Sequence, residues 1–398
     1  MLPTDYTITF PIAAYSPGPG RLFVPTGLAR DLRSQLKFEP HLRIIVPRAR
    51  RQSDVRDAEE LSSGELPGFS FRLLPWNGNQ RTFLLFRYPI RKVLEAEAAR
   101  ALVWHTCCGV LRRDLTTESF AAGRNKAVGV RVLGLDSDPA AMLEQSGRAK
   151  DADVLLRRYE AWSGEVDLTI MVGKGVQERY ASHARRSVLT HSVWLNTNDL
   201  ADADSVARKF HDLSVVRMVL PSRFSDWKGI DDVIIALRSV SNKLTPWTLD
   251  IMGDGDDRAR LLELAAAEPR IRFIEPLPYG AAFFAALRTY HLVIAPTRAQ
   301  EETRIVYDAA ASGCALLHSA TTTLDAALFQ LEHRWRFLPG NSGDLARSLG
   351  TAFDQRASWQ DAGLEGLRFM HGRTIDEMHA IRAAEITPLK QAWLSAQS

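Results

Sequence analysis

The chain lacks the features that mark several common protein classes. It has three cysteines among 398 residues, and Cys107 and Cys108 are adjacent, which fits neither a disulfide framework nor the ligand spacing of a metal site. No stretch approaches the roughly 20 apolar residues that span a bilayer. The N-terminal residues show no basic segment before their short apolar run, so we expect no signal peptide. These absences favour a cytoplasmic protein.

The chain also lacks a strong charge imbalance. Its 50 basic and 47 acidic residues leave a net charge of +3, so we expect no nucleic acid as a partner. Two local stretches are basic, "RIIVPRARRQ" at residues 43–52 and "RRSVLTH" at residues 185–191. These stretches could meet phosphates or an anionic membrane surface, or they could be ordinary solvated loops.

The sequence does contain an alternation of β-rich apolar runs with segments of helical spacing. Near the N-terminus, "YTITFPIAA" precedes the turn "YSPGPG", and residues 22–36 have helical spacing with Leu28, Leu32 and Leu36 on one face. A second series follows the polar run "NTNDLADADS" at residues 196–205. Such alternation is typical of parallel sheets with helices on both faces, so we predict two doubly wound α/β domains.

The polar run sets the predicted domain boundaries. We expect residues 1–197 to form the N-terminal domain and residues 198–378 the C-terminal domain. Residues 379–398 are predicted to be a helix that could cross back to the N-terminal domain. In doubly wound sheets, ligands bind outside the carboxyl ends of the strands, so we expect the chemistry in loops that follow strands and between the domains.

Loops of the predicted strands carry candidate ligand-binding residues. Arg223 and Lys228, in "PSRFSDWKG", could converge on a phosphate or could be ordinary surface cations. Glycine turns can admit a ligand close to the backbone, or they can simply be turns. The candidate glycines are Gly18 and Gly20 in the first series and Gly253 and Gly255 in the second.

A third loop, "PTRAQEETRIVYDAAASG" at residues 296–313, follows the apolar strand "HLVIAP" and leads into a helix. A carboxylate in the first turns of such a helix can hydrogen-bond sugar hydroxyls, and Asp308 stands eight residues after Gln300. Alternatively, Glu301 and Glu302 are ordinary acids that stabilise the positive end of the helix dipole.

Taken in order, these segments resemble the retaining GT-B glycosyltransferases of family 4, which are glycosyl transferases group 1. The family pattern is Arg-x4-Lys-Gly, then Gly-x-Gly, then Pro-Ser-x-x-Glu-x7-Glu-Ala-x-Ala-x-Gly. This chain has the same spacing from Arg223 to Gly229, from Gly253 to Gly255 and from Pro296 to Gly313. The resemblance covers residues 214–318 strongly and implies a GT-B fold, in which two Rossmann-like domains face a central cleft.

The resemblance also implies an activity. Such an enzyme is a retaining hexosyltransferase of class EC 2.4, which moves a sugar from a UDP- or GDP-linked donor to a glycan or lipid-linked acceptor. It needs no metal ion, serves polysaccharide biosynthesis, and works in the cytoplasm or at the inner face of the plasma membrane. Two alternatives stay open: a degenerate nucleotide-sugar-binding protein with little turnover, and a GT-B nucleotide-sugar epimerase.

By the resemblance, Arg223 and Lys228 would hold the donor diphosphate and stabilise the charge of the leaving group. Asp308 stands where the family usually carries a glutamate that binds the ribose. Gln300 stands where a glutamate usually faces the transferred sugar. Asp136, after a strand of the first domain, would assist at the reacting centre, with His105 as an alternative in "WHTCCG".

The chain departs from the family between the two acidic positions. The usual Gly-Phe-Gly is replaced by Glu301, Glu302 and Thr303, which add bulk and charge near the donor. One of these glutamates could take over from Gln300. Arg304 could add a further phosphate contact.

Overall fold

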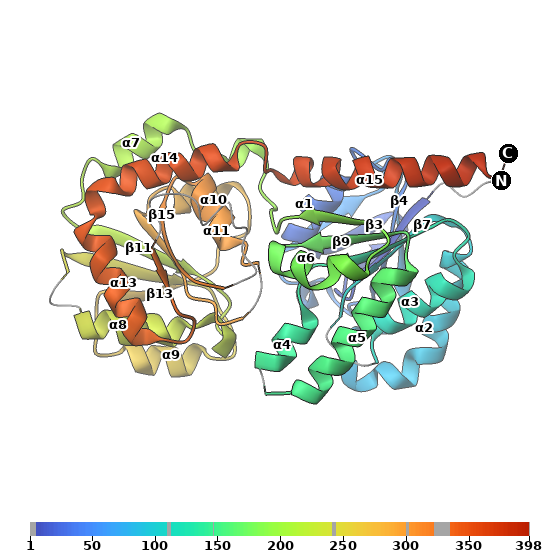
Figure 1. Cartoon of the computed structure of the whole chain (residues 1–398), viewed down its shortest axis with the longest axis horizontal. Coiled ribbons are helices and arrows are strands. Elements are labelled where there is room, and N and C mark those ends of the chain that lie inside the picture. Colours follow the sequence, from blue (N-terminus) through green and yellow to red (C-terminus); the bar gives the residue numbers. More distant parts are fainter. Residues whose placement is uncertain are drawn as a thin grey trace. The chain divides into compact units, whose positions relative to one another are not determined.

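The computed structural model describes residues 5–109, 113–145, 147–240, 244–299, 302–321 and 335–397. The chain divides into two compact units, which Figure 1 labels by helix and strand. Unit 1 comprises Met1–His191 and Ile375–Ser398, and unit 2 comprises Ser192–Thr374. Each unit contains a parallel sheet with helices packed on it, which confirms the predicted fold class.

Unit 1 is built on a seven-stranded parallel sheet in the order β10-β9-β8-β7-β1-β4-β6. Its strands are β1 (Asp5–Thr9), β4 (Leu42–Pro47), β6 (Phe69–Leu74), β7 (Ala101–Cys107), β8 (Val130–Leu135), β9 (Leu168–Val172) and β10 (Ser187–Thr190). Strands β1 and β7 pair at the point where the strand order reverses. Every residue of β7 is buried, as expected for a central strand covered on both faces.

A small antiparallel sheet of β2 (Tyr15–Gly18), β3 (Arg21–Pro25) and β5 (Ala58–Ser62) is also part of unit 1. The prediction that the helix starts at residue 22 is wrong, because Leu22 and Val24 alternate with less buried residues along β3. Helix α1 (Thr26–Gln35) begins after Pro25, and Leu28 and Leu32 are buried on it.

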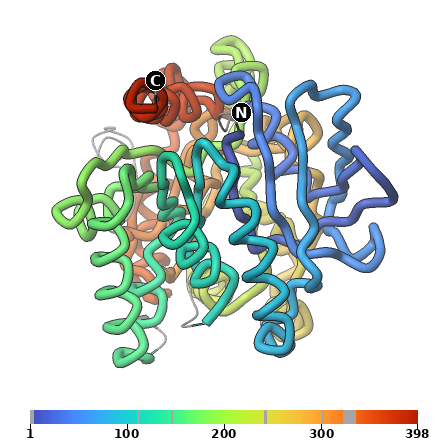
Figure 2. Tube along the Cα trace, turned by 90° about the vertical axis from the view of Figure 1, so that its right-hand side faces the viewer, coloured from blue at the N-terminus to red at the C-terminus, as the bar shows by residue number. Residues whose placement is uncertain are grey.

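The other helices of unit 1 are α2 (Phe83–Ala98), α3 (Leu115–Lys126), α4 (Pro139–Gln145), α5 (Ala149–Glu165), α6 (Lys174–Tyr180) and α15 (Ile375–Ser395). Short 3-10 turns add η1 (Gln52–Asp54), η2 (Gln80–Thr82) and η3 (Ala181–His183). Figure 2 faces unit 1 and shows α2 and α3 side by side, in light blue to cyan.

Helix α15 packs on α1 and β10 and so belongs to unit 1, although it lies at the other end of the chain. Polar pairs join it to α1 and to the turn after α1: Asp376 with Lys37, His379 with Asp31, and Lys390 with Glu39. Its Ile386 lies in the hydrophobic core of the unit.

Unit 2 contains a six-stranded parallel sheet in the order β13-β12-β11-β14-β15-β16. Its strands are β11 (Val216–Pro221), β12 (Trp247–Met252), β13 (Ile271–Ile274), β14 (Leu292–Ala295), β15 (Ala315–Ser319) and β16 (Trp335–Phe337). Numbered by their place in the unit, the strands follow the order 3-2-1-4-5-6 of dinucleotide-binding folds. The order reverses between β11 and β14, which pair directly.

Helices cover both faces of this sheet, as Figure 1 shows. One face carries α8 (Ile230–Val240), α9 (Arg258–Ala265) and α13 (Ser342–Asp354). The other carries α7 (Ala203–Phe210), α10 (Ala281–Leu287), α11 (Ile305–Ala311) and α14 (Trp359–Met370). The 3-10 turns are η4 (Thr197–Asp199), η5 (Asp226–Lys228) and η7 (Arg356–Ser358). Within the described ranges of the whole chain, none of the helices is both long and apolar enough to cross a lipid bilayer.

Candidate functional site

The candidate site of unit 2 lies at the carboxyl ends of β11 and β14. In a doubly wound sheet, the strand order reverses at one point, and the loops there diverge to opposite faces and leave room for a ligand. The loop after β11 carries Arg223 and Lys228, and the loop after β14 leads to Asp308. Two sequence motifs therefore meet at one edge of one sheet, together with the glycine turn after β12.

The loops after β11 and β14 are bonded to each other through their backbones. The Arg298 amide donates to the Trp227 carbonyl over 2.7 Å. At Gly229, which has φ +62°, an added Cβ would lie 2.3 Å from the Pro296 carbonyl oxygen. The glycine of the Lys-Gly pair is thus required for this close approach, and it fixes the loop that carries Lys228.

The glycine turn after β12 supports the same loop from the other side. A Cβ on Gly253 would lie 1.9 Å from the Ser222 carbonyl oxygen, and one on Gly255 would lie 2.3 Å from the Phe224 carbonyl oxygen. The Phe224 amide donates to the Asp254 carbonyl over 2.9 Å. Because these two glycines have no side chain, the backbone at Ser222 and Phe224, on either side of Arg223, can pack directly against them.

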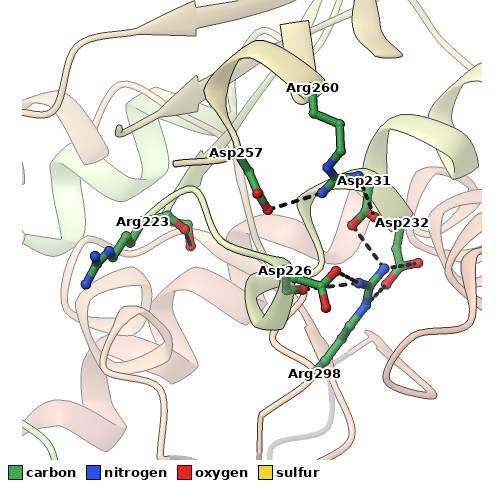
Figure 3. A network of polar contacts seen from close by, with 8 residues as sticks. Arg223, Asp226, Asp231, Asp232, Asp257, Arg260 and Arg298 are labelled. Carbon is green, nitrogen blue, oxygen red and sulfur yellow. Dashed lines mark hydrogen bonds and ion pairs between the residues drawn. The ribbon is translucent and has the colours of Figure 1, made fainter. Parts of the chain in front are cut away.

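An arginine that the sequence analysis did not single out holds this region together. The Arg298 guanidinium makes ion pairs of 2.9 Å with Asp226, Asp231 and Asp232, and Asp231 also pairs with Arg260 at 3.2 Å, as Figure 3 shows. The pKa of Arg298 is raised, above all by its hydrogen bond to Asp232. The aspartates stand in η5 and in the first turn of α8, so Arg298 ties the loop after β14 to both.

Arg223 and Lys228 occupy the loop that this network supports. The side chain of Arg223 is exposed and points away from the network in Figure 3, and it forms no ion pair with a described residue. Lys228 is half-buried at the end of η5. The network thus neutralises Arg298 with acids while the guanidinium of Arg223 stays exposed at the edge of the sheet, where an anion can reach it.

Asp308 lies inside the protein, in the first turn of α11, with an exposed fraction of 3%. Its Oδ1 accepts a hydrogen bond of 2.7 Å from the Tyr279 hydroxyl. The Tyr279 ring packs against Trp194, Phe283 and Phe284. This aromatic cluster orients the carboxylate of Asp308, and nothing in the spacing of the motif indicates that Tyr279 is its partner.

Two further residues of the loop before α11 are held by neighbours within unit 2. The buried carboxylate of Glu302 accepts from the Ser192 amide over 2.6 Å and from the Tyr307 hydroxyl over 2.5 Å. The guanidinium carbon of Arg304 lies 3.4 Å from the centroid of the Trp194 ring, a close cation–π contact. Both side chains therefore fix the entry to α11.

Of the other three candidate residues before α11, the structure describes only Thr303. Thr303 is half-buried, and its carbonyl accepts from the Val306 amide over 3.3 Å. Gln300 and Glu301 lie outside the described residues. Whether Glu301 or Glu302 replaces a catalytic acid at the position of Gln300 stays a prediction.

The remaining candidates lie in unit 1. Asp136 is exposed and directly follows β8, so it also stands at a carboxyl edge. Gly18 ends β2, and Gly20, with φ +72°, forms the turn into β3. A Cβ on Gly18 would meet no atom within 4 Å, so close packing does not explain that glycine.

His105, the alternative to Asp136, is buried within β7. Its Nδ1 lies 2.7 Å from the Tyr6 hydroxyl, and its Nε2 has no hydrogen-bond partner and faces Gly134, where an added Cβ would lie only 2.6 Å away. Burial lowers the pKa of His105 to about 3, and Arg382 of α15 adds to this effect. The imidazole is therefore neutral at physiological pH.

In the part of the chain that the structure describes, no cluster of three or more His, Cys, Asp or Glu side chains is arranged to hold a metal ion. The expectation that the reaction needs no metal stays a prediction.

Comparison with known proteins agrees with this geometry. Residues 216–355 match the family described as Glycosyl transferases group 1. A search among curated proteins gives no match to the chain. The matched residues run from β11 past β16, so they include the loops after β11, β12 and β14.

Solved structures resemble the chain over nearly its whole length. A sucrose-phosphate synthase from Thermosynechococcus elongatus has a TM-score of 0.73 at 15% identity and covers 99% of this chain and 100% of its own. HepE from Anabaena, in complex with UDP and glucose, has a TM-score of 0.66 at 14% identity and covers 97% and 100%. WaaG, a glycosyltransferase involved in lipopolysaccharide biosynthesis, has 0.66 at 12% and covers 95% and 98%. The chain therefore has the GT-B fold, as predicted.

Proposed function

We propose that the protein is a retaining glycosyltransferase that moves a hexosyl group from a nucleotide-diphosphate donor to a glycan or glycolipid acceptor. The observation that carries this proposal is the arrangement at the carboxyl edge of unit 2. There the loop with Arg223 and Lys228 and the helix with Asp308 lie at the reversal of a 3-2-1-4-5-6 sheet, in the segment that matches glycosyl transferases group 1.

In this proposal, each side chain acts on one part of the donor. Arg223 and Lys228 bind the diphosphate and stabilise the negative charge that the leaving nucleotide acquires as the glycosidic bond breaks. Asp308 accepts hydrogen bonds from the ribose hydroxyls. By the resemblance, Gln300 would act on the transferred sugar, and Arg304 stabilises the loop near the phosphates. Because two cations already balance the diphosphate charge, the reaction would need no metal ion.

The acceptor would bind to unit 1, where Asp136 stands at the end of β8 and could hydrogen-bond a sugar hydroxyl. HepE was crystallised with UDP and with UDP-glucose, and WaaG acts in lipopolysaccharide biosynthesis, which supports a nucleotide sugar as donor and a saccharide or lipid-linked acceptor here. The cytoplasm, where nucleotide sugars are made, is the proposed location.

A second candidate is a protein that binds a nucleotide sugar with little turnover. It is favoured by the contacts of Glu302, whose carboxylate is buried and accepts hydrogen bonds from Ser192 and Tyr307. An acid so held is poorly placed to supply the charge that Gln300 lacks. A third, nucleotide-sugar epimerisation, would change the donor in the absence of any acceptor.

One series of measurements separates these candidates. Thermal unfolding in the presence of UDP, GDP and their sugars identifies the nucleotide, because a ligand that binds only the folded state raises Tm. The donor so found is then supplied in radiolabelled form with lipid-linked and free saccharide acceptors. The proposal expects labelled product with the anomeric configuration of the donor by NMR.

The other outcomes are equally distinct. Binding without transfer or donor hydrolysis across all acceptors would contradict the proposed enzyme and support the binding protein. A changed sugar on an intact nucleotide, with no acceptor present, would indicate an epimerase. An inverted product would contradict retention alone.

A further inference from the structure

The outward face of α2 in unit 1 is unusually apolar for a surface. Leu84, Leu85 and Tyr88 are 59%, 80% and 69% exposed. The opposite face of the same helix buries Phe83 and Ile90 in the core of the unit. Helix α2 is thus apolar on both sides, and packing within unit 1 accounts for only one of them.

Cations border the exposed apolar face. With 3.6 residues per turn, positions 84, 85, 88 and 92 fall on one side of α2, and Arg81 stands in η2 just before this helix. Arg81 and Lys92 are both exposed, and the Lys92 ammonium lies 5.4 Å from the centroid of the Tyr88 ring. The exposed side therefore combines apolar tips with cations at both ends, the pattern of helices that lie in a membrane interface.

A cavity of about 400 Å³ opens beside the start of this helix. Its lining residues come from the loops after β4 and β6 and from the beginning of α2: Arg48, Arg50, Pro75, Trp76, Asn77, Thr82 and Phe86. The cavity therefore stands at the carboxyl edge of the unit 1 sheet. Two guanidinium groups beside two aromatic rings suit a phosphate joined to an apolar body.

The charges around this surface are not balanced locally. Arg48, Arg50 and Arg81 are exposed and form no ion pair with any described residue. The contrast within α2 is clear, because Arg87 and Arg91 both pair with the buried carboxylate of Glu118. The cations on the core side of the helix are neutralised, whereas those near the cavity and the apolar face keep their charge.

We propose that this surface, Arg48, Arg50, Arg81, Leu84, Leu85, Tyr88 and Lys92, binds an anionic lipid membrane. Leu84, Leu85 and Tyr88 enter the boundary between headgroups and acyl chains. Arg48 and Arg50 bind the phosphate of one lipid in the cavity, and Arg81 and Lys92 contact neighbouring headgroups. Positive charge next to exposed apolar side chains complements a surface that is negative outside and apolar beneath.

Membrane binding of this kind needs neither donor nor turnover, so it stands independently of the proposed reaction. The test is flotation of the full chain with vesicles of phosphatidylcholine alone or mixed equally with phosphatidylglycerol. We expect binding to the mixed vesicles only, and we expect it to weaken as salt is added, because screening acts on exposed charges.

Matched variants locate the surface. The double variant Leu84→Ser, Leu85→Ser should bind the mixed vesicles at least roughly ten-fold more weakly, since two apolar side chains no longer enter the lipid. The control is Leu338→Ser in unit 2, because Leu338 is 59% exposed, as Leu84 is. Both proteins should keep the Tm of the wild type, since the replaced side chains are exposed.

The charged part is tested in the same way. Replacing Arg48 and Arg50 by serine should weaken binding about five-fold per charge, the equivalent of about 1 kcal/mol each, and should reduce its salt dependence. Arg185→Ser, in the other basic stretch, should change nothing. Equal binding to neutral vesicles, full binding of the leucine variant, or an equal loss in Arg185→Ser would each overturn the proposal.

Discussion

The carboxyl edges of the two sheets invite comparison, because both sheets reverse their strand order beside the first parallel strand of the unit. In unit 2 the reversal lies between β11 and β14, and in unit 1 between β1 and β7. The loops at the unit 2 edge carry an ion-pair network and the exposed side chain of Arg223. The unit 1 edge has instead a buried, neutral His105 below it and a basic cavity to one side.

We infer that the sheet topology determines where these loops meet and that the residues of the loops determine which ligand can bind there. A diphosphate site needs cations that do not move when charge develops, and the unit 2 loops are fixed by Arg298 and by glycines at close backbone contacts. Among the described residues of unit 1, no comparable ion-pair network fixes the loops at the point where the strand order reverses. This fits a donor on unit 2 and an acceptor on unit 1, and the following substitutions test that division.

The largest expected effect belongs to Lys228. Replacing it by alanine removes a positive charge that the proposal places on the leaving diphosphate, so turnover should fall roughly 100-fold or more. Steady-state rates with the identified donor check this, and Lys150→Ala, an exposed lysine of unit 1, is the control. A variant that turns over at a near-normal rate would remove Lys228 from the site.

The second prediction concerns the stability that the Arg298 ion-pair network provides, not the rate of the reaction. Arg298→Ala leaves Asp226, Asp231 and Asp232 without their shared cation, so unfolding should cost about 3 kcal/mol less free energy. Denaturant titration measures this. Arg260→Ala removes a more exposed arginine from the same network, with a side chain 49% exposed, and should cost less than about 1 kcal/mol. Equal losses would contradict the central role of Arg298.

The buried His105 of unit 1 predicts an effect of pH on stability. Because the pKa of His105 is lowered to about 3 in the folded protein, the unfolded chain binds a proton below pH 6.5 that the folded chain does not. Stability from this group is complete above pH 6.5 and is lost as pH falls towards 3, by about 2 kcal/mol at pH 5. The slope of unfolding free energy against pH should flatten in His105→Asn, and an unchanged slope would contradict the prediction.

The sequence predicted the strands and loops of the candidate site better than it predicted the side chains that hold those loops in place. Strand–helix alternation was enough to predict two doubly wound domains, and the resemblance carried by three spaced motifs implied the GT-B fold, because parallel strands and glycine turns leave local signals. Arg298 and Tyr279 left none, since their partners Asp232 and Asp308 are distant in the chain and meet them only after folding. Adjacent acids at the start of α8 fit the helix dipole equally well, so their arginine could not be inferred.

Tyr279 gives the smallest and most selective test. Its hydroxyl donates to Asp308 over 2.7 Å, and Tyr290 makes a bond of the same length to Asp250 elsewhere in unit 2. Tyr279→Phe keeps the aromatic packing but loses the bond that orients the proposed ribose ligand, so Kd for the nucleotide should rise about five- to ten-fold with kcat nearly unchanged. Tyr290→Phe should leave Kd unchanged in calorimetric titrations. If both variants weaken binding equally, Asp308 has no special place at the nucleotide.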